Sequence, residues 1–237
     1  MSPEVLAPHR VAIYAAPAPG TDWWDRGSEW LGRCASRRCS LPMPEITGVD
    51  PALQSAMTAD PRRYGWHATL KAPFRLSPQS NLWALRDAVA AICRDHRAFD
   101  LGDLQVARLG SFLALQPEHA PPALGALADD CVRRLQPLAA PLNGAELARR
   151  RRAPLTPEED ALMLAWGYPW VFHKFRFHFS LTGPLTGVPD DVVGRLWLGA
   201  TRQFGALPPM WLDRLSIFIE PSPGADFVLL EQLELGA

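Results

Sequence analysis

Two short stretches of the chain carry the same polar pattern and could together perform acid–base chemistry. The sequence HATLKAP begins at His67 and HFSLTGP begins at His178, an offset of 111 positions. Because residues two apart in a strand share a face, His67 is expected beside Thr69, and His178 beside Ser180. A single histidine in a strand is more often structural, whereas two such motifs in register indicate catalysis.

Paired imidazoles suit the hydrolysis of a phosphate ester. One neutral ring can take a proton from the attacking water while the other, protonated, gives one to the leaving oxygen; the unperturbed pKa of ~6.5 permits both roles. Thr69 and Ser180 can donate hydrogen bonds to the phosphoryl oxygens. The two motifs are nearly equivalent, so both assignments of acid and base stay open.

Two cations are expected on the faces that carry the histidines. Lys71 lies four residues after His67, and Arg176 two residues before His178. An arginine can bind a phosphate through two parallel hydrogen bonds, and a lysine acts as a point charge. The groove is therefore expected to be locally cationic and suited to a small anion.

Other polar residues near the motifs have less specific interpretations. Tyr64 and Tyr168 flank the two strands and could line the groove or simply pack, and Arg149–Arg152 is interpreted as a solvated helix face. His173 is expected on the opposite strand face from His178, and no HExxH-type ligand set occurs. We therefore expect neither a metal ion nor another cofactor.

The composition of the 237 residues favours a soluble globular protein and leaves a local anion site possible. Apolar residues make up 48% of the chain, and the net charge of −1 does not favour a bulk nucleic-acid binder. The first residues lack a signal-peptide pattern, and no apolar run approaches the ~20 residues of a membrane helix. A cytoplasmic protein without membrane association is expected, with reduced thiols at Cys34, Cys39, Cys93 and Cys131.

The repeat extends beyond the two motifs. In each copy a turn follows the histidine strand, then a helix beginning near Ser80 or Asp190, then a β-hairpin. The hairpins are expected to turn near Gly110 and through the PSPGAD sequence. We interpret the pattern as an ancient duplication. The expected organisation is one bilobal domain over residues 1–237, with repeat halves at about 60–118 and 171–235, an N-terminal segment 1–59 and a helical linker 119–170.

Local signals predict the remaining elements. Asp50 and Pro51 are expected to begin a helix that stops before Pro61. The other predicted elements are a strand over 10–17, helices over 21–33, 121–136 and 157–166, and a strand over 168–181.

The motifs His67-Ala68-Thr69 and His178-Phe179-Ser180 resemble those of the two-histidine (2H) phosphoesterase superfamily. The surrounding sequences RYGWHATLKAPFRL, WGYP and FRFHFSLTGP resemble, more narrowly, a branch of uncharacterised proteins associated with phosphonate metabolism. The resemblance runs across most of the chain. Two such motifs in these contexts are a specific signal, whereas one alone would be weak.

This resemblance implies an α+β fold in which two antiparallel sheets with flanking helices surround a central cleft. It also implies a metal-independent phosphodiesterase acting on ribose cyclic phosphates, with His67 and His178 catalytic and Thr69 and Ser180 binding phosphate. Phosphoribosyl 1,2-cyclic phosphate, opened to a ribose bisphosphate, is the substrate that this branch suggests. A second phosphate would then contact the cations near the motifs, Lys71 and Arg176.

Two other functions stay open. The first is an enzyme that processes RNA ends carrying a 2′,3′-cyclic phosphate, as other members of the superfamily do. The second is a non-catalytic phosphate- or nucleotide-binding protein, although such a binder would not need both histidines and both hydroxyls. A small phosphorylated sugar or nucleotide is the expected partner, and an RNA end is the second choice.

Overall fold

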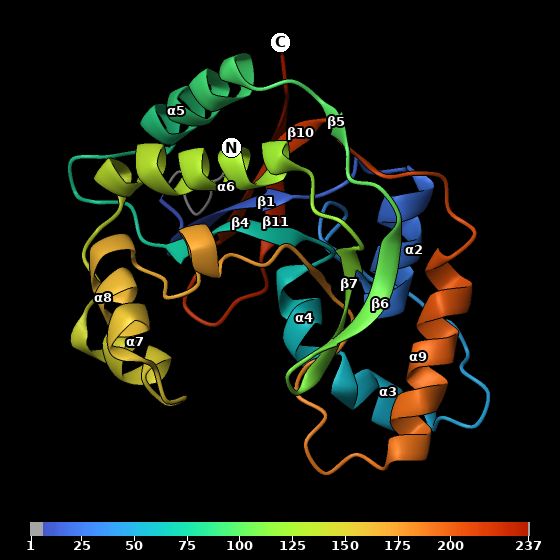
Figure 1. The fold of residues 1–237 in the computed structure, drawn as a ribbon. Helices are drawn as coiled ribbons and strands as arrows, with labels where there is room; N and C mark the ends of the chain where they lie inside the picture. Colours follow the sequence, from blue (N-terminus) through green and yellow to red (C-terminus); the bar gives the residue numbers. More distant parts are fainter. Residues whose placement is uncertain (1–6, 237) are drawn as a thin grey trace.

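A seven-stranded antiparallel sheet runs through the protein and carries both histidine motifs (Figure 1). In the computed structural model, which describes residues 7–236, the strand order is β11-β10-β1-β4-β8-β7-β6. These strands are β1 (Arg10–Ala15), β4 (Ala68–Phe74), β6 (Leu104–Leu109), β7 (Phe112–Pro117), β8 (Phe179–Ser180), β10 (Arg214–Glu220) and β11 (Val228–Glu234). Two further antiparallel pairs join β2 (Arg33–Cys34) to β3 (Cys39–Ser40) and β5 (Phe99–Asp100) to β9 (Trp211–Leu212).

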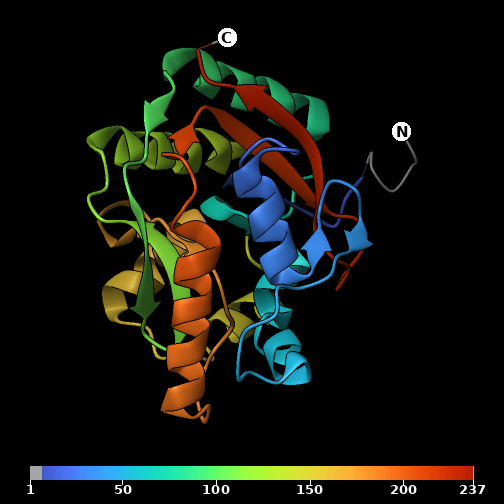
Figure 2. The ribbon, with the colours of Figure 1, turned by 90° about the vertical axis from the view of Figure 1, so that its right-hand side faces the viewer.

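Two pairs of helices cover the sheet. α5 (Leu82–Asp95) and α6 (Pro122–Leu135) lie side by side, α6 over β4 and α5 beside the β10–β11 hairpin (Figures 1 and 2). α2 (Asp22–Leu31) packs beside α9 (Asp190–Phe204), which contacts β6. The remaining helical elements are α3 (Pro51–Met57), α4 (Ala59–Tyr64), α7 (Gly144–Arg150), α8 (Pro157–Trp166) and the 3₁₀ turns η1 (Gln136–Leu138) and η2 (Phe172–Lys174). The α+β class expected from the sequence is confirmed.

Each β-hairpin belongs to the group of strands that contains the motif strand of the other predicted half. The β10–β11 hairpin pairs with β1, which lies between it and β4, whereas the β6–β7 hairpin pairs directly with β8. The two groups of strands meet through a single residue pair, Ala68 with Phe179. The two antiparallel sheets expected around a cleft are therefore continuous at that pair. The duplication itself and its boundaries stay predictions, and residues 1–6 of the predicted N-terminal segment lie outside the described residues.

Aromatic side chains on the sheet face opposite the motifs form the centre of the core. Trp66 precedes His67 and points to the other side, where its ring stacks on Phe179 and Phe204 at centroid distances of 5.0 and 5.1 Å. Gly27 of α2 lies against the same indole, since a Cβ there would come within 2.1 Å of a ring carbon. This close packing fixes the backbone immediately before His67.

Several predicted elements are confirmed. Asp50 caps α3 through the Leu53 amide, and Pro51 is its first residue. The predicted helix over 157–166 matches α8, and both predicted hairpins are present. All four cysteines are free thiols. Among residues 7–236, no helix is long and apolar enough to cross a membrane.

One predicted strand is wrong, whereas the predicted end of α3 and the predicted starts of α5 and α9 are confirmed. α3 ends at Met57, before Pro61, and the separate helix α4 then contains Pro61 in its first turn. α5 begins at Leu82 with Asn81 as its cap, and α9 begins at Asp190. The predicted strand over 168–181 shrinks to β8, because a 3₁₀ turn with Phe172 at φ 56° interrupts the extended chain.

The contact between α2 and Trp66 predicts opposite effects for two glycine-to-alanine substitutions. Gly27→Ala should lower the free energy of unfolding by roughly 1–3 kcal/mol, because the new methyl group overlaps the indole. Gly125→Ala in α6 should raise it by up to about 1 kcal/mol, because its Cβ meets no atom within 4 Å and alanine favours the helix. Urea unfolding measures both, and equal values for the two variants would contradict this packing.

Candidate active site

A cavity of about 780 Å³ opens beside the centre of the sheet and contains both histidine motifs. Thr69 of β4 and Ser180 of β8 line it, as do His67 and His178, which come immediately before these two strands. Ring and hydroxyl groups from segments more than a hundred residues apart thus face the same space.

The strand register explains how the motifs meet. Ala68 of β4 pairs with Phe179 of β8 in an antiparallel arrangement. One residue away on either side, this register sets His67 across from Ser180 and sets the threonine of the first motif across from the second histidine. Residues directly opposite share a face, with Cβ atoms about 4.5–5.5 Å apart. Each histidine therefore lies opposite the hydroxyl of the other motif as well as beside its own.

Backbone carbonyls hold the two imidazoles in the same way. Nδ1 of His67 donates to the Gly65 carbonyl at 2.8 Å, and Nδ1 of His178 donates to the Arg176 carbonyl at 2.8 Å. Because a carbonyl oxygen can only accept, each neutral ring carries its proton on Nδ1 and a lone pair on Nε2. Both rings are therefore preset with Nε2 as the atom available for proton transfer.

Burial separates the two histidines in acidity. The pKa of His67 is lowered from 6.5 to about 4, chiefly by burial and to a smaller extent by the charge of a protonated His178, while the bond to the Gly65 carbonyl acts in the opposite direction. The ring of Tyr14 stacks on His67 at a centroid distance of 3.8 Å and removes solvent from one face. Burial also lowers the pKa of His178, but by less. The two motifs are nearly equivalent in sequence, but their histidines thus differ in pKa in the structure. His67 is neutral at pH 7.

Lys71 does not line this cavity, so the expectation that it shares a face with His67 is wrong. The pairing of β1 with β4 matches Tyr14 with Thr69 but Ile13 with Lys71, which leaves one extra residue on β4. Such a β-bulge interrupts the alternation of faces along a strand. The prediction from sequence assumed regular alternation of faces along the strand. The bulge places the Lys71 side chain on the opposite face from the one expected.

The Lys71 side chain instead packs against α6. Its ammonium group donates to the Gln136 side-chain oxygen at 3.0 Å and to the Val132 carbonyl at 3.3 Å, and lies 5.1 Å from the ring centroid of Phe74. Burial lowers the pKa of Lys71 to about 8. This cation is therefore part of the packing between β4 and α6 rather than of the cavity.

The other five predicted binding residues do line the cavity: Thr69 and Ser180 of the motifs, and also Arg176, Tyr64 and Tyr168. Arg176 is exposed at its edge. Tyr64 lies between His67 and Phe227, at ring-centroid distances of 6.0 and 5.0 Å. Tyr168 carries the guanidinium of Arg150 over its ring at 5.4 Å, and burial raises the pKa of its hydroxyl to about 12.

Several cavity residues were missed from the sequence. Tyr14 and Arg10 line it from β1. The sequence feature that could have indicated them is that these two polar residues lie four apart, on one face of an otherwise apolar strand. Arg149 and Arg150 line it from α7; Arg149 is exposed, but Arg150 is partly buried, so the interpretation as a solvated face is wrong for Arg150. His173 also lines the cavity, since the 3₁₀ turn replaces the strand that was expected to turn it away.

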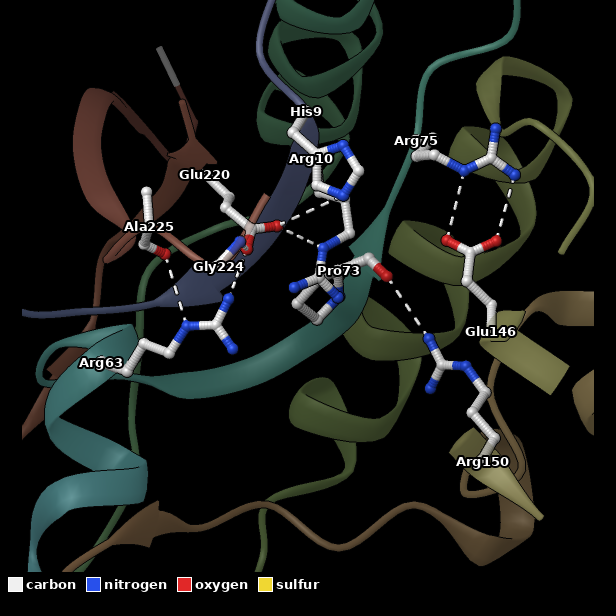
Figure 3. A network of polar contacts seen from close by, with 10 residues as sticks. All are labelled: His9, Arg10, Arg63, Pro73, Arg75, Glu146, Arg150, Glu220, Gly224 and Ala225. Atoms are coloured by element: carbon white, nitrogen blue, oxygen red, sulfur yellow. Dashed lines mark hydrogen bonds and ion pairs between the residues drawn. The ribbon is translucent and has the colours of Figure 1, made fainter. Parts of the chain in front are cut away.

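The cavity wall is cationic, as expected for an anion site. The lining contains Arg10, Arg63, Arg149, Arg150, Lys174 and Arg176 against the carboxylates Asp60 and Glu159. Behind it, fully buried Glu220 forms ion pairs with both Arg10 and Arg63 (Figure 3). Burial opposes its ionisation, but the hydrogen bond and charge of Arg10 outweigh this and lower the pKa of Glu220. Two guanidinium groups thus share one carboxylate. Among residues 7–236, no three His, Cys, Asp or Glu side chains are grouped to hold a metal ion.

A family model described as "Protein of unknown function (DUF1045)" matches residues 69–228. The chain is 40% identical over 222 residues to a protein of Janthinobacterium sp. (strain Marseille) named ribose 1,5-bisphosphate phosphokinase PhnN, over 92% of this chain and 49% of that protein. A protein of the same name from Laribacter hongkongensis (strain HLHK9) is 36% identical over 93% of this chain and 50% of that protein. The chain spans about half the length of both curated relatives.

Solved structures give weaker likenesses. E. coli LigT complexed with 3′-AMP matches with a TM-score of 0.46 and 12% identity, over 96% of this chain and 98% of that chain. A structure described as a phosphoesterase matches with a TM-score of 0.44 and 12% identity, over the same shares. Likenesses with TM-scores and identities this low carry no argument about the chemistry of the cavity.

Burial of His67 predicts a pH-dependent stability. Its pKa is about 4 when folded and ~6.5 when unfolded, so the unfolded chain binds more protons between these values. The stability present above pH 6.5 is lost as the pH falls towards 4. Relative to His67→Gln, the wild type should lose roughly 1 kcal/mol of unfolding free energy between pH 7 and 5, because solvent reaches part of the ring.

Urea unfolding at the two pH values measures this difference. His119→Gln, at an exposed histidine outside the cavity, is the control and should follow the wild type. Identical pH dependence in His67→Gln and the wild type would show that His67 is not shifted.

Proposed function

The chain belongs to the DUF1045 family of proteins of unknown function, and we propose that it is a phosphodiesterase that opens a ribose cyclic phosphate by two-histidine acid–base catalysis. One observation carries the proposal: two imidazoles line one cavity, each with Nδ1 bonded to a backbone carbonyl and each opposite the hydroxyl of the other motif. The cationic lining supports an anionic substrate.

The geometry gives each group a role in the ring opening. His67 is the base, because its low pKa keeps Nε2 unprotonated, and it takes a proton from the attacking water. His178 is the acid, because its pKa is shifted less and the negative substrate favours its protonated form. As the water oxygen bonds to phosphorus, the ester bond to the ribose oxygen breaks and that oxygen receives the proton from His178. Thr69 and Ser180 donate to the non-bridging oxygens.

The proposed substrate is phosphoribosyl 1,2-cyclic phosphate. Breaking its bond between phosphorus and the ribose 2-oxygen yields ribose 1,5-bisphosphate. The curated relatives are named as kinases of that product, although this chain matches only about half of their length. A protein containing both activities would make ribose 1,5-bisphosphate and then phosphorylate it.

Replacing either histidine should remove most of the activity. His67→Ala and His178→Ala are each expected to lower turnover by about 10²–10⁴-fold, because each removes one proton transfer. Phosphorus NMR measures ring opening in EDTA, with His119→Ala as the exposed control. Circular dichroism tests whether each variant is folded. Near-wild-type turnover in a folded His67 or His178 variant would exclude this mechanism.

The same assay separates the other functions. The panel contains phosphoribosyl 1,2-cyclic phosphate, nucleoside 2′,3′-cyclic phosphates and a short RNA with a cyclic end. Preference for the RNA would replace the proposed substrate by an RNA end. Binding without opening of any compound would indicate a phosphate- or nucleotide-binding protein.

The pH profile of kcat/KM should be bell-shaped, with its maximum below pH 6.5. Activity should rise as the pH increases through about 4, because His67 must lose its proton. It should fall as the pH passes the lowered pKa of His178, because that ring must keep its proton. Initial rates from pH 3.5 to 9 measure the profile. A flat profile would assign the proton transfers to other groups.

A further inference from the structure

Among the described residues that line the cavity, Arg150 is a partly buried arginine that forms no ion pair with a carboxylate. Arg150, the last residue of α7, lines the cavity and lies over the ring of Tyr168 at 5.4 Å. Its Nε is enclosed without a hydrogen-bond partner. Its Nη2 reaches the Pro73 carbonyl only at 3.4 Å, a long hydrogen bond (Figure 3).

The neighbouring arginines show the contrast. Arg10 and Arg63 share the Glu220 carboxylate, and Arg75 binds both oxygens of Glu146 at 3.2 and 3.0 Å (Figure 3). Glu146 lies one turn before Arg150 on the same helix, so it would be the natural partner, but Arg75 already occupies it. Among residues 7–236, no carboxylate forms an ion pair with Arg150.

Leaving this charge unpaired is costly. Burial lowers the pKa of Arg150, which shows that its surroundings disfavour the charged form. A guanidinium nevertheless stays protonated in proteins, so the charge persists in partial burial. A ligand anion that enters the cavity beside such a cation supplies charged hydrogen bonds and offsets the free-energy cost of its burial.

The contact of Arg150 with the Pro73 carbonyl of β4 indicates how far along the strand this cation lies from the motifs. Pro73, which it contacts, comes between Lys71 and Phe74, whose partners on β1 are Ile13 and Val11. Thr69 pairs with Tyr14, so the separation counted along β1 is two to three residues, roughly 7–10 Å. This length suits a pentose that carries a phosphate at each end.

We propose that Arg150, with Arg149 beside it, binds a second phosphate of the substrate, remote from the phosphorus that reacts between the two histidines. The substrate is then a ribose cyclic phosphate that carries a further phosphate. The proposal rests on the proposed function for the reacting end. It assigns to α7 the role that the family resemblance had suggested for Lys71 and Arg176.

A pair of substrates isolates this contact. We compare kcat/KM for phosphoribosyl 1,2-cyclic phosphate and for ribose 1,2-cyclic phosphate, which lacks the remote phosphate. The wild type should prefer the phosphorylated compound by roughly 10- to 100-fold, the effect of one or two charged hydrogen bonds. Arg150→Met should lose that preference by slowing only the phosphorylated compound, and Arg150→Lys should retain part of it.

The matched control is Arg152→Met, two residues along the chain, exposed and outside the cavity lining. It should keep the wild-type preference. Thermal unfolding should show Arg150→Met to be as stable as the wild type or more stable, because an unpaired partly buried charge is removed. A wild type that opens both compounds equally well, or an Arg150→Met variant that keeps the preference, would overturn the proposal.

Binding of ribose 5-phosphate separates this proposal from the proposed reaction. Calorimetric titration should show roughly 10- to 100-fold weaker binding to Arg150→Met than to the wild type, and no change in Arg152→Met. If the wild type opens neither cyclic phosphate but shows this pattern, the proposed reaction fails and the phosphate subsite stands. If ribose 5-phosphate does not bind, or binds all variants equally, the subsite is wrong even where ring opening is observed.

Discussion

The site depends on one antiparallel contact, the pairing of Ala68 with Phe179. This pair is where the two groups of strands meet, and the residues beside it are the two histidines and the two hydroxyls. A shift of one residue in this register would turn a motif to the other face of the sheet. Trp66 opposes such a shift, because its ring is held between Phe179 and Phe204 on the core side. Packing on one face thus fixes the chemistry on the other.

The exchange of hairpins makes the site a joint product of both halves of the chain. The β10–β11 hairpin extends the group that contains β4, and the β6–β7 hairpin extends the group that contains β8. Tyr14 from β1 and Phe112 from β7 contact the histidines from these two sides, the first at 3.8 Å and the second at 5.4 Å between ring centroids. Since the two neighbours shield the rings to different extents, two similar motifs acquire different acidities.

Charge in and around the cavity follows a single principle, that a cation withdrawn from water requires an anion or several neutral oxygens as partners. Glu220 supplies one for Arg10 and Arg63, and Glu146 supplies one for Arg75. Lys71 avoids the cavity and is held by neutral oxygens near α6. Arg150 has no such partner among the described residues, and its guanidinium lines the same space as the histidines. The cavity thereby carries uncompensated positive charge where a phosphorylated ligand would bind.

The sequence by itself determined the elements whose signals are local, and the repeated histidine motifs. Helix caps such as Asp50, the two hairpins and the spacing of His67 and Thr69 follow from short-range geometry, so they could be predicted. Only the tertiary structure decided what depends on contacts between distant segments. These are the bulge that turns Lys71 away, the cross-strand partners of the histidines, and the unequal burial that separates their pKa values. The place of Arg150 in the cavity was also decided there, because its neighbours come from α7, β4 and the segment around Tyr168, which meet only in the folded chain.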